Sequence, residues 1–313
     1  SICPVFGLDK DLGECLALAH DLGHTPFGHA GGDALDAVMG AYGGFDHNAQ
    51  TLRILTTLEH RYAEFDGLNL TWEVLEGIAK HNGPLVGPRA NRPAPLMGFV
   101  TAYNAQNDLE LEGFAGPEAQ AAALADDIAY NNHDIDDGLR AGLLTIDKLL
   151  DLPLVGPVFA QVIERYPNAE TSRLVYESVR RLINSMVNDL IAETGQRLER
   201  AAPKSVDDIR ALDYPVVAFS DQMTGNDRTV KAFLMEHLYR HELVNKMTAH
   251  AKQVVTDLFG QYMNDPGALP DDWRASAEGA DEQKRARTVC DFIAGMTDRF
   301  AQLEHDRLEP FRL

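Results

Sequence analysis

Apolar residues recur at helical spacing along most of this chain, and this periodicity constrains its fold more than any other feature. In the stretch SRLVYESVRRLINSMVNDLIAE (172–193), the apolar side chains step by three or four positions: Val175, Val179, Leu182, Met186 and Leu190. That spacing places them on one face of a helix. Similar patterns cover residues 10–22, 31–41, 47–60, 71–81, 117–150, 227–263 and 285–305. The periodicity therefore predicts an all-α protein.

Other structural signals are few. The segment YPVVAF (214–219) is the best candidate for a strand, and it is short. Two stretches rich in proline and glycine, 81–98 and 264–284, predict loops. The chain of 313 residues is 45% hydrophobic, which is enough for one large domain or two intimately packed ones.

Charge and cysteine content narrow the classes of partner and compartment. Acidic residues outnumber basic ones 48 to 28, giving a formal charge of −20, which disfavours broad contact with nucleic acid or anionic membranes. The three cysteines are widely spaced and predict neither a disulfide framework nor a zinc knuckle. No apolar run has membrane-spanning length, and no signal-peptide pattern is present. We therefore expect a cytoplasmic protein.

The stretch LALAHDLGHTPFGHAGGDAL (16–35) carries an unusual density of chemically active side chains: His20, Asp21, His24 and His29. We expect the preceding helix to end at Gly23, so that His20 and Asp21 lie at its C-terminal end. His24 and His29 would follow on a loop whose glycines let the backbone approach a ligand closely.

Imidazole and carboxylate together suit a first-row divalent metal ion. Adjacent helical residues diverge by about 100°, so a third ligand has to arrive from elsewhere. Two alternatives stay open at this point. The histidines can serve as capping or packing residues, or His20 and His24 can form half of a zinc-protease helix, although Asp21 stands where that motif needs a glutamate.

A second unusual segment is AAALADDIAYNNHDIDDGLRAGLL (121–144). On a helix, one face would carry Asp126, Tyr130, Asp134 and Asp137. A solvated acidic face is the simple alternative. The flanking alanines and leucines, however, predict that this face borders a cleft, where a carboxylate needs a partner such as a metal. We therefore pair Asp126 with His20 and Asp21 as the third ligand.

Five stretches in order resemble the deoxyguanosine triphosphate triphosphohydrolases, a family of HD-domain metalloenzymes. They are AHDLGHTPFGHAG, GGFDHNAQTLRI, GLNLTWEVLEGIAKHNGP, LADDIAYNNHDIDDGLRAG and DFIAGMTDRFA. The resemblance implies an all-α HD-domain core with additional C-terminal helices. We accordingly expect a metal-dependent core over residues 1–150 and a helical region packed on it over 151–313. Because the chain opens on Ser1 within a helix-like pattern, we also expect the N-terminal part of the core to be absent from this sequence.

The family cleaves a deoxynucleoside triphosphate (dNTP) to a deoxynucleoside and inorganic triphosphate, and its members often assemble as homo-oligomers, frequently hexamers. By resemblance, the metal ligands are His20, Asp21 and Asp126, and the ion is one of manganese, magnesium, cobalt, iron or zinc. His29 matches the catalytic histidine, with His24 and His47 near the phosphates. The substrate-binding residues implied by resemblance are Tyr130 under the deoxyribose, Asp134 at the 3′-hydroxyl, and Arg240 in the phosphate- or base-binding shell. Contact with nucleic acid is expected to be absent or only regulatory.

This sequence departs from the family pattern in two places. The family's first metal ligand is a histidine in an upstream helix, which this chain does not contain. The family also commonly has glutamate where Gly32 stands, and that acid orients the catalytic histidine; here Asp33 comes one residue late. Two alternatives to the dNTP reaction therefore stay open: another HD-type nucleotide phosphohydrolase, or a catalytically weak nucleotide-binding regulator.

Overall fold

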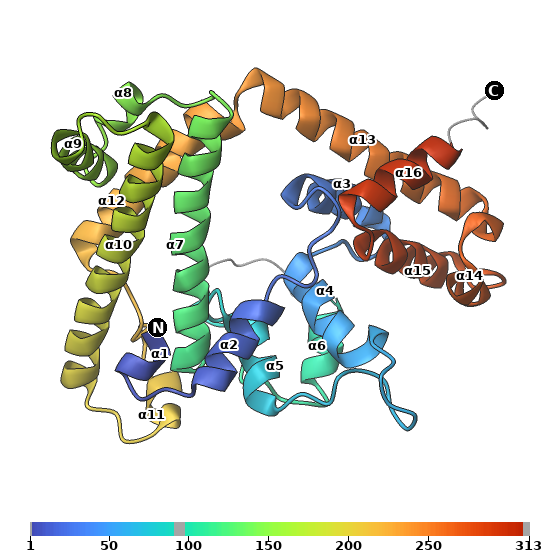
Figure 1. Cartoon of the computed structure of the whole chain (residues 1–313). Coiled ribbons are helices and arrows are strands. Elements are labelled where there is room, and N and C mark those ends of the chain that lie inside the picture. The colour runs from blue at the N-terminus through green and yellow to red at the C-terminus, as the bar shows by residue number, and fades with distance from the viewer. Residues whose placement is uncertain (1, 91–97, 309–313) are drawn as a thin grey trace. The chain divides into compact units, whose positions relative to one another are not determined.

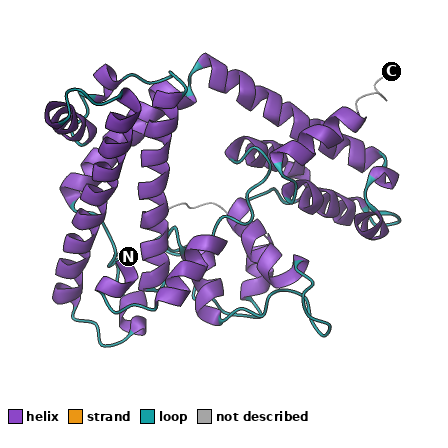
Figure 2. Cartoon of the chain, in the orientation of Figure 1, coloured by secondary structure: helices purple, strands orange, loops and turns teal. Residues whose placement is uncertain are grey.

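The computed structural model describes residues 2–90 and 98–308, and every regular element in that part of the chain is helical (Figure 2). One isolated bridge, between His60 and Gly67, is the only strand-like pairing among those residues. The expectation of an all-α protein is confirmed. None of the described helices combines the length and apolar character needed to cross a membrane.

The helices are labelled in chain order in Figure 1. The α-helices are α1 (Ile2–Val5), α2 (Lys10–Ala19), α3 (His29–Met39), α4 (His47–Arg53), α5 (Trp72–Lys80), α6 (Gly98–Asn104), α7 (Pro117–Arg140), α8 (Ile146–Leu149), α9 (Val155–Arg165), α10 (Thr171–Ala201), α11 (Val206–Arg210), α12 (Asp221–Leu234), α13 (Glu242–Asn264), α14 (Asp271–Ala277), α15 (Glu282–Ala294) and α16 (Asp298–Leu308). Short 3₁₀ turns η1 (Gly40–Tyr42) and η4 (Pro266–Ala268) and π-helical turns η2 (Ile54–Leu58) and η3 (Met235–Tyr239) join or extend them.

The chain divides into two compact units, and each is described by itself. The α7 unit comprises residues 1–17, 80–91 and 112–245, and the histidine unit comprises residues 18–79, 92–111 and 246–313. The units interleave along the sequence, because each is assembled from three separate stretches. The expected division at residue 150 stays a prediction.

The core of the α7 unit forms where α10 packs along α7 and α9 (Figure 1). The predicted apolar stripe of α10 is buried there, and Leu182 and Leu190 are almost completely inaccessible. They join Ile128 and Ile135 of α7 and Phe159 of α9 in one cluster. The burial of this stripe explains why α10 is stable as a long helix.

A separate core fills the histidine unit. Leu35 of α3 packs with Val255 and Leu258 of α13 and with Val289 and Ile293 of α15, and all five side chains are fully buried. The N-terminal α3 is thus held by helices from the C-terminal part of the chain.

Three predicted helices are interrupted, and glycine accounts for two of the breaks. The predicted run 117–150 ends at Arg140 because Gly142, with φ at 69°, turns the backbone into the left-handed region. The run 285–305 breaks after α15, whose C-cap is Gly295. The run 227–263 breaks at the π-turn η3, where the Arg240 N–H donates to the Met235 carbonyl.

Two expectations were wrong: the strand over 214–219 and the uninterrupted loop over 264–284. Residues 214–219 form no strand, because no partner strand lies among the described residues. Val216 and Val217 are buried instead, and the Val217 N–H donates to the Gln120 side chain of α7. The predicted loop 264–284 contains helix α14. The predicted loop 81–98 lies partly outside the described residues.

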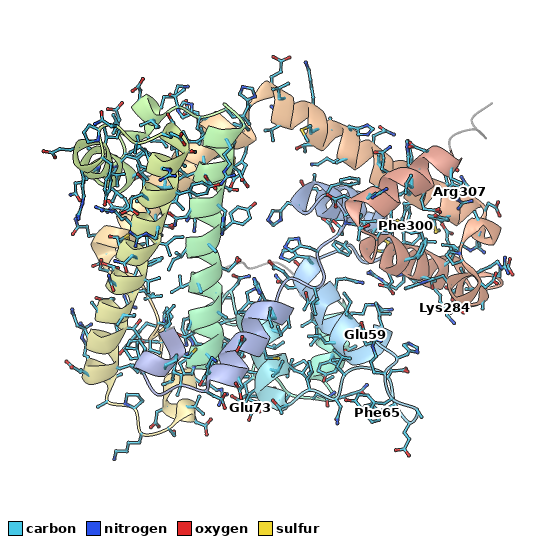
Figure 3. The ribbon with its side chains drawn as sticks, viewed as in Figure 1. Glu59, Phe65, Glu73, Lys284, Phe300 and Arg307 are labelled. Atoms are coloured by element: carbon cyan, nitrogen blue, oxygen red, sulfur yellow. The ribbon has the colours of Figure 1, made fainter. Side chains whose placement is uncertain are left out.

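Polar contacts fasten α16 to α13. The Tyr262 hydroxyl, on a fully buried side chain, donates to Glu304 Oε2 at 2.7 Å, and Arg307, which projects from α16 (Figure 3), pairs with the same oxygen at 2.7 Å. These two hydrogen bonds lower the pKa of Glu304, while burial acts in the opposite direction. The ionised carboxylate is therefore stabilised in the folded protein.

We predict that Glu304→Gln lowers the free energy of unfolding at pH 7 by about 1 kcal/mol. Because the folded pKa lies below the unfolded value of about 4.3, the stabilisation is present above that value and is lost as the pH falls through the folded pKa. Denaturant titrations at pH 7 and at low pH measure the difference, which should shrink in acid. The exposed Glu278, changed to Gln, is the control; equal losses for both variants would contradict the prediction.

Candidate metal centre and histidine corner

The turn that follows α2 brings two potential metal donors together. His20 and Asp21 lie directly after Ala19, the last residue of α2, so the helix ends before them and not at Gly23 as expected. His20 Nε2 is 3.2 Å from Asp21 Oδ2, and His24 Nε2 is 3.5 Å from Asp21 Oδ1. Hydrogen bonds from His20 and His24 lower the pKa of Asp21 far below its usual value, despite partial burial. An ionised carboxylate beside an imidazole is a donor set that fits a divalent cation.

Close backbone approach fixes this turn against α4. A Cβ atom at Gly23 would lie 2.1 Å from the His47 carbonyl oxygen and 2.3 Å from the Thr51 nitrogen. Only glycine tolerates such contact. The turn after α2 therefore depends on the absence of a side chain at this position.

Thr51, which is completely buried, joins the turn to α4 through its hydroxyl group. The Gly23 N–H donates to Thr51 Oγ1 at 2.9 Å. The same hydroxyl lies 3.0 Å from the carbonyl oxygens of His20 and His47, either of which can accept its proton. One side chain thus connects the backbone of the His20–Gly23 turn with the first residue of α4.

Three imidazole rings meet beside this turn. The rings of His24 and His47 stack with centroids 4.4 Å apart, and His29 meets them edge-on at 5.0 Å and 5.8 Å. Burial lowers the pKa of His47, the nearby His24 and His29 lower it further, and Asp46 opposes the shift. The structure therefore gathers His24, His29 and His47, which are up to 23 residues apart in sequence, into one cluster.

His29 is the first residue of α3 rather than a loop residue, which corrects the expectation from the sequence. Two residues in the left-handed region precede it: Phe27 with φ at 63° and Gly28 with φ at 56°. The Phe27 N–H donates to Asp298 Oδ1 at 2.8 Å. A non-glycine residue in this conformation is costly and persists only where surrounding contacts hold it, and the bond to Asp298 is such a contact.

No carboxylate in the described part of the chain orients the His29 ring. Among the residues that the structure describes, no group forms a hydrogen bond with its ring nitrogens. Asp33, which follows Gly32, forms an ion pair with Lys252 of α13 at 2.8 Å. Asp33, which stands one residue after the position where the family commonly has glutamate, therefore pairs with Lys252.

The acidic face of α7 carries the other predicted residues. Asp126, Tyr130 and Asp134 occur at four-residue intervals on this helix, as the sequence indicated. Asp134 accepts a hydrogen bond from the Tyr239 hydroxyl of η3. Burial raises the pKa of Asp134, although the hydrogen bond from Tyr239 partly opposes the shift, and burial together with Asp134 raises the pKa of Tyr239.

A polar network holds this part of α7 against α12. Lys231 Nζ lies 2.9 Å from Asp127 Oδ1 and 3.1 Å from Asp227 Oδ2, and Asn131 Nδ2 donates to Asp227 Oδ1 at 2.7 Å. Asp127 and Asn131 are the sequence neighbours of Asp126 and Tyr130. Their contacts with α12 therefore hold this stretch of α7 in a fixed position on α12.

Sequence reasoning missed two residues at these sites. Tyr239 is adjacent to the predicted Arg240, but its link to Asp134 spans 105 positions and left no local signal. Thr51 is an ordinary helix residue in sequence, although its place four positions after His47 was a usable clue. Arg240 itself follows η3 with an exposed side chain.

Comparisons with known proteins agree with this arrangement of motifs. A family model described as "HD domain" matches residues 1–131, and one described as "Phosphohydrolase-associated domain" matches residues 217–307. The chain is 58% identical over 308 residues to a protein of Parvibaculum lavamentivorans named deoxyguanosinetriphosphate triphosphohydrolase-like protein, covering 98% of this chain and 78% of that protein.

Two further relatives have related names. The deoxyguanosinetriphosphate triphosphohydrolase-like protein 1 of Mesorhizobium japonicum is 54% identical over 96% of this chain and 74% of its own length. The deoxyguanosinetriphosphate triphosphohydrolase-like protein of Caulobacter vibrioides is 49% identical over 98% and 77%.

We predict that Thr51→Val lowers the free energy of unfolding by about 1–3 kcal/mol, because it leaves the buried Gly23 N–H without an acceptor. Thr51→Ser keeps the hydroxyl and should retain more of the stability, losing only a methyl group. Denaturant-induced unfolding of both variants measures the difference. Equal stability of the valine and serine variants would contradict the role assigned to the hydroxyl.

Proposed function

The chain belongs to the HD-domain family of deoxyguanosinetriphosphate triphosphohydrolase-like proteins, and from that premise we propose that it hydrolyses dNTPs to deoxynucleosides and inorganic triphosphate. Membership of this family indicates a phosphohydrolase. The observation that carries the finer proposal is the cluster of His24, His29 and His47 beside the His20–Asp21 pair. Such a cluster offers ring N–H donors to the phosphate oxygens of a triphosphate, in a protein whose formal charge of −20 otherwise repels phosphates.

We assign His20, Asp21 and Asp126 as ligands of a divalent metal ion. Two observations support His20 and Asp21 as ligands. His20 Nε2 lies 3.2 Å from Asp21 Oδ2, and an imidazole with a carboxylate suits manganese, magnesium, cobalt, iron or zinc. Asp126 is assigned on the resemblance of its motif. When bound, the metal would polarise a phosphoryl oxygen and acidify a water ligand.

The reaction forms a bond between a water oxygen and the α-phosphorus and breaks the bond from that phosphorus to the 5′-oxygen. Triphosphate then leaves whole, and the 5′-oxygen gains a proton. We assign His29 to proton transfer, because its exposed ring opens α3 beside the other two histidines. His24 and His47 would bind phosphate oxygens and hold the α-phosphate in line.

We assign the deoxyribose to the face shared by Tyr130 and Asp134. The Tyr239 hydroxyl donates to Asp134 Oδ2, which leaves Oδ1 to accept the sugar 3′-hydroxyl. A ring packed against C2′, as proposed for Tyr130, would exclude a ribose hydroxyl. Arg240, next to Tyr239, is proposed to contact the phosphates or the base.

The proposal includes a cytoplasmic location and a homo-oligomer, as the family resemblance implies. A specific observation favours a second candidate function, that of a catalytically weak nucleotide-binding regulator. Gly32 has no side chain to orient His29, and Asp33 pairs with Lys252. The loss of such an orienting carboxylate costs activity in comparable sites.

Product analysis separates these candidates. We expect dGTP incubated with the protein and Mn²⁺ to yield deoxyguanosine and tripolyphosphate in equal amounts, resolved by ion-exchange chromatography. The appearance of dGMP with pyrophosphate would instead indicate another HD-type phosphohydrolase. Saturable dGTP binding without turnover would indicate the regulator.

The ligand set has its own test. Asp126→Ala should lose the bound metal and the activity, while Asp127→Ala, which removes the neighbouring carboxylate paired with Lys231, should keep the metal. Metal content is measured by mass spectrometry after dialysis. Full metal occupancy in Asp126→Ala would remove that residue from the ligand set.

We predict that Gly32→Glu raises kcat at least about tenfold, because it supplies a carboxylate beside the ring of His29. A Cβ at this position has ordinary space, with Phe45 Cε1 at 3.9 Å and Thr25 Oγ1 at 4.0 Å. Gly32→Gln, which has the same shape without the charge, is the matched control. If both variants change kcat equally, orientation by a carboxylate is not what limits the rate.

A further inference from the structure

The histidine unit contains a large cavity whose lining excludes His20, His24, His29 and His47, the four residues of the histidine corner. Its volume is about 1030 Å³, and its walls come from α4, α6, α14 and α15. Sites for small organic ligands typically enclose about 300–1,000 Å³. The cavity is therefore large enough for a ligand of nucleotide size.

A buried glutamine lines this space. Gln50 of α4 lines the cavity and is only 2% exposed. Within residues 2–90 and 98–308, its side chain forms no hydrogen bond. A primary amide can donate and accept at once. Gln50 is thus suited to the polar edge of a bound ring.

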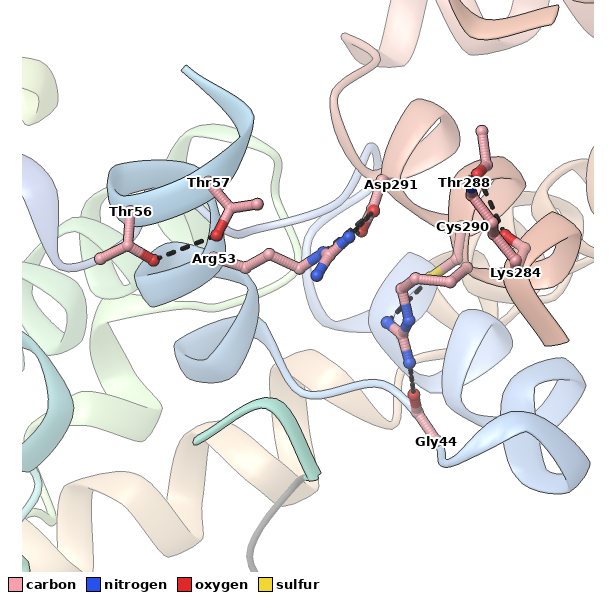
Figure 4. A network of polar contacts seen from close by, with 9 residues as sticks. Gly44, Arg53, Thr56, Thr57, Lys284, Thr288, Cys290 and Asp291 are labelled. Carbon is pink, nitrogen blue, oxygen red and sulfur yellow. Dashed lines mark hydrogen bonds and ion pairs between the residues drawn. The ribbon is translucent and has the colours of Figure 1, made fainter. Parts of the chain in front are cut away.

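Most carboxylates on the cavity wall are already engaged. Asp291, with a 2% exposed side chain, receives bidentate hydrogen bonds from Arg53, the shorter at 2.7 Å (Figure 4). Asp46 and Asp281 accept backbone N–H groups at the starts of α4 and α15. Asp272 is the remaining acid on the wall.

Two cations on the wall have no carboxylate partner among the described residues. Arg287 donates to the Gly44 carbonyl oxygen at 2.9 Å and approaches Cys290 Sγ (Figure 4), and both acceptors are neutral. Lys284, one turn earlier on α15, has an exposed side chain (Figure 3). Their charges can therefore bind an anion.

Aromatic side chains complete the wall. Phe99 of α6 lies under the Arg53 guanidinium, 5.3 Å from ring centroid to Cζ, and Tyr42 and Trp273 line the same cavity. Planar rings stack favourably on such side chains.

We infer that this cavity binds a small planar anion, with its ring against the aromatic wall, its polar edge at Gln50, and its anionic group at Lys284 and Arg287. Nucleoside monophosphates and aromatic carboxylates share this chemistry. The inference concerns binding at a site separate from the histidine corner, and it does not depend on the reaction proposed there.

Isothermal titration calorimetry on the full chain tests it with three probes: dGMP, salicylate and inorganic phosphate. An Asp134→Ala background removes binding at the proposed sugar face. We expect dGMP, salicylate or both to bind at one saturable site per chain. Tighter binding of dGMP identifies a nucleotide as the ligand, and tighter binding of salicylate identifies an aromatic carboxylate.

In that background, Lys284→Ala should weaken binding about tenfold, and Gln50→Leu should weaken it several-fold. Arg299→Ala removes an exposed cation from α16 of the same unit and should bind as the background does. Thermal melting of each variant checks that it is folded. Lys284→Ala should melt as the background does, because it changes only an exposed side chain.

Three results would overturn the inference. The first is that neither dGMP nor salicylate binds, and the second is that inorganic phosphate alone binds as tightly as both of them. The third is that Lys284→Ala leaves the affinity for the planar anion unchanged.

Discussion

The contact between the turn after α2 and the start of α4 is the constraint on which the histidine corner depends. At Gly23 the two backbones approach so closely that no side chain fits. The Thr51 hydroxyl accepts the buried N–H that this approach would leave without water, and its own proton can go to the carbonyl group of His20 or of His47. Main-chain packing therefore holds the backbones at His20 and His47 stiffly in place. An ion or phosphate site needs that stiffness, because a loose donor set binds weakly.

The distribution of charge matters as much as this geometry. The chain carries a formal charge of −20, so its general field repels phosphates. Groups that can contact a phosphate are instead concentrated locally: the ring nitrogens of the imidazole cluster, and the cationic Lys284 and Arg287 on α15. Beside Lys284 and Arg287 the cavity wall also carries the aromatic side chains of Tyr42, Phe99 and Trp273. Each place is thus a local exception to the field of the whole molecule.

Short-range patterns predicted well what local physics decides. The α10 stripe, the helix class and the junction after α2 all follow from spacing within one or two turns. The motif around His29 was also visible, although the start of α3 at His29 was not. Long-range pairings could not be read: the contact of Tyr239 with Asp134 spans 105 positions, and the bond of Arg53 to Asp291 spans 238. The prediction of a strand over 214–219 was wrong for the same reason, since a strand requires a distant partner that a single stretch of sequence does not reveal. The roles of the predicted ligands stay predictions.

The hydrogen bond from the Phe27 N–H to Asp298 joins positions 271 residues apart. It holds the unusual backbone conformation that directly precedes His29, and α3 itself packs on α13 and α15. The amino-terminal motif therefore cannot be excised as an autonomous module, since a fragment without the carboxy-terminal helices would lack both the anchor and the surface on which α3 rests. At this corner, residues from the two segments that separate family models match share one hydrophobic core.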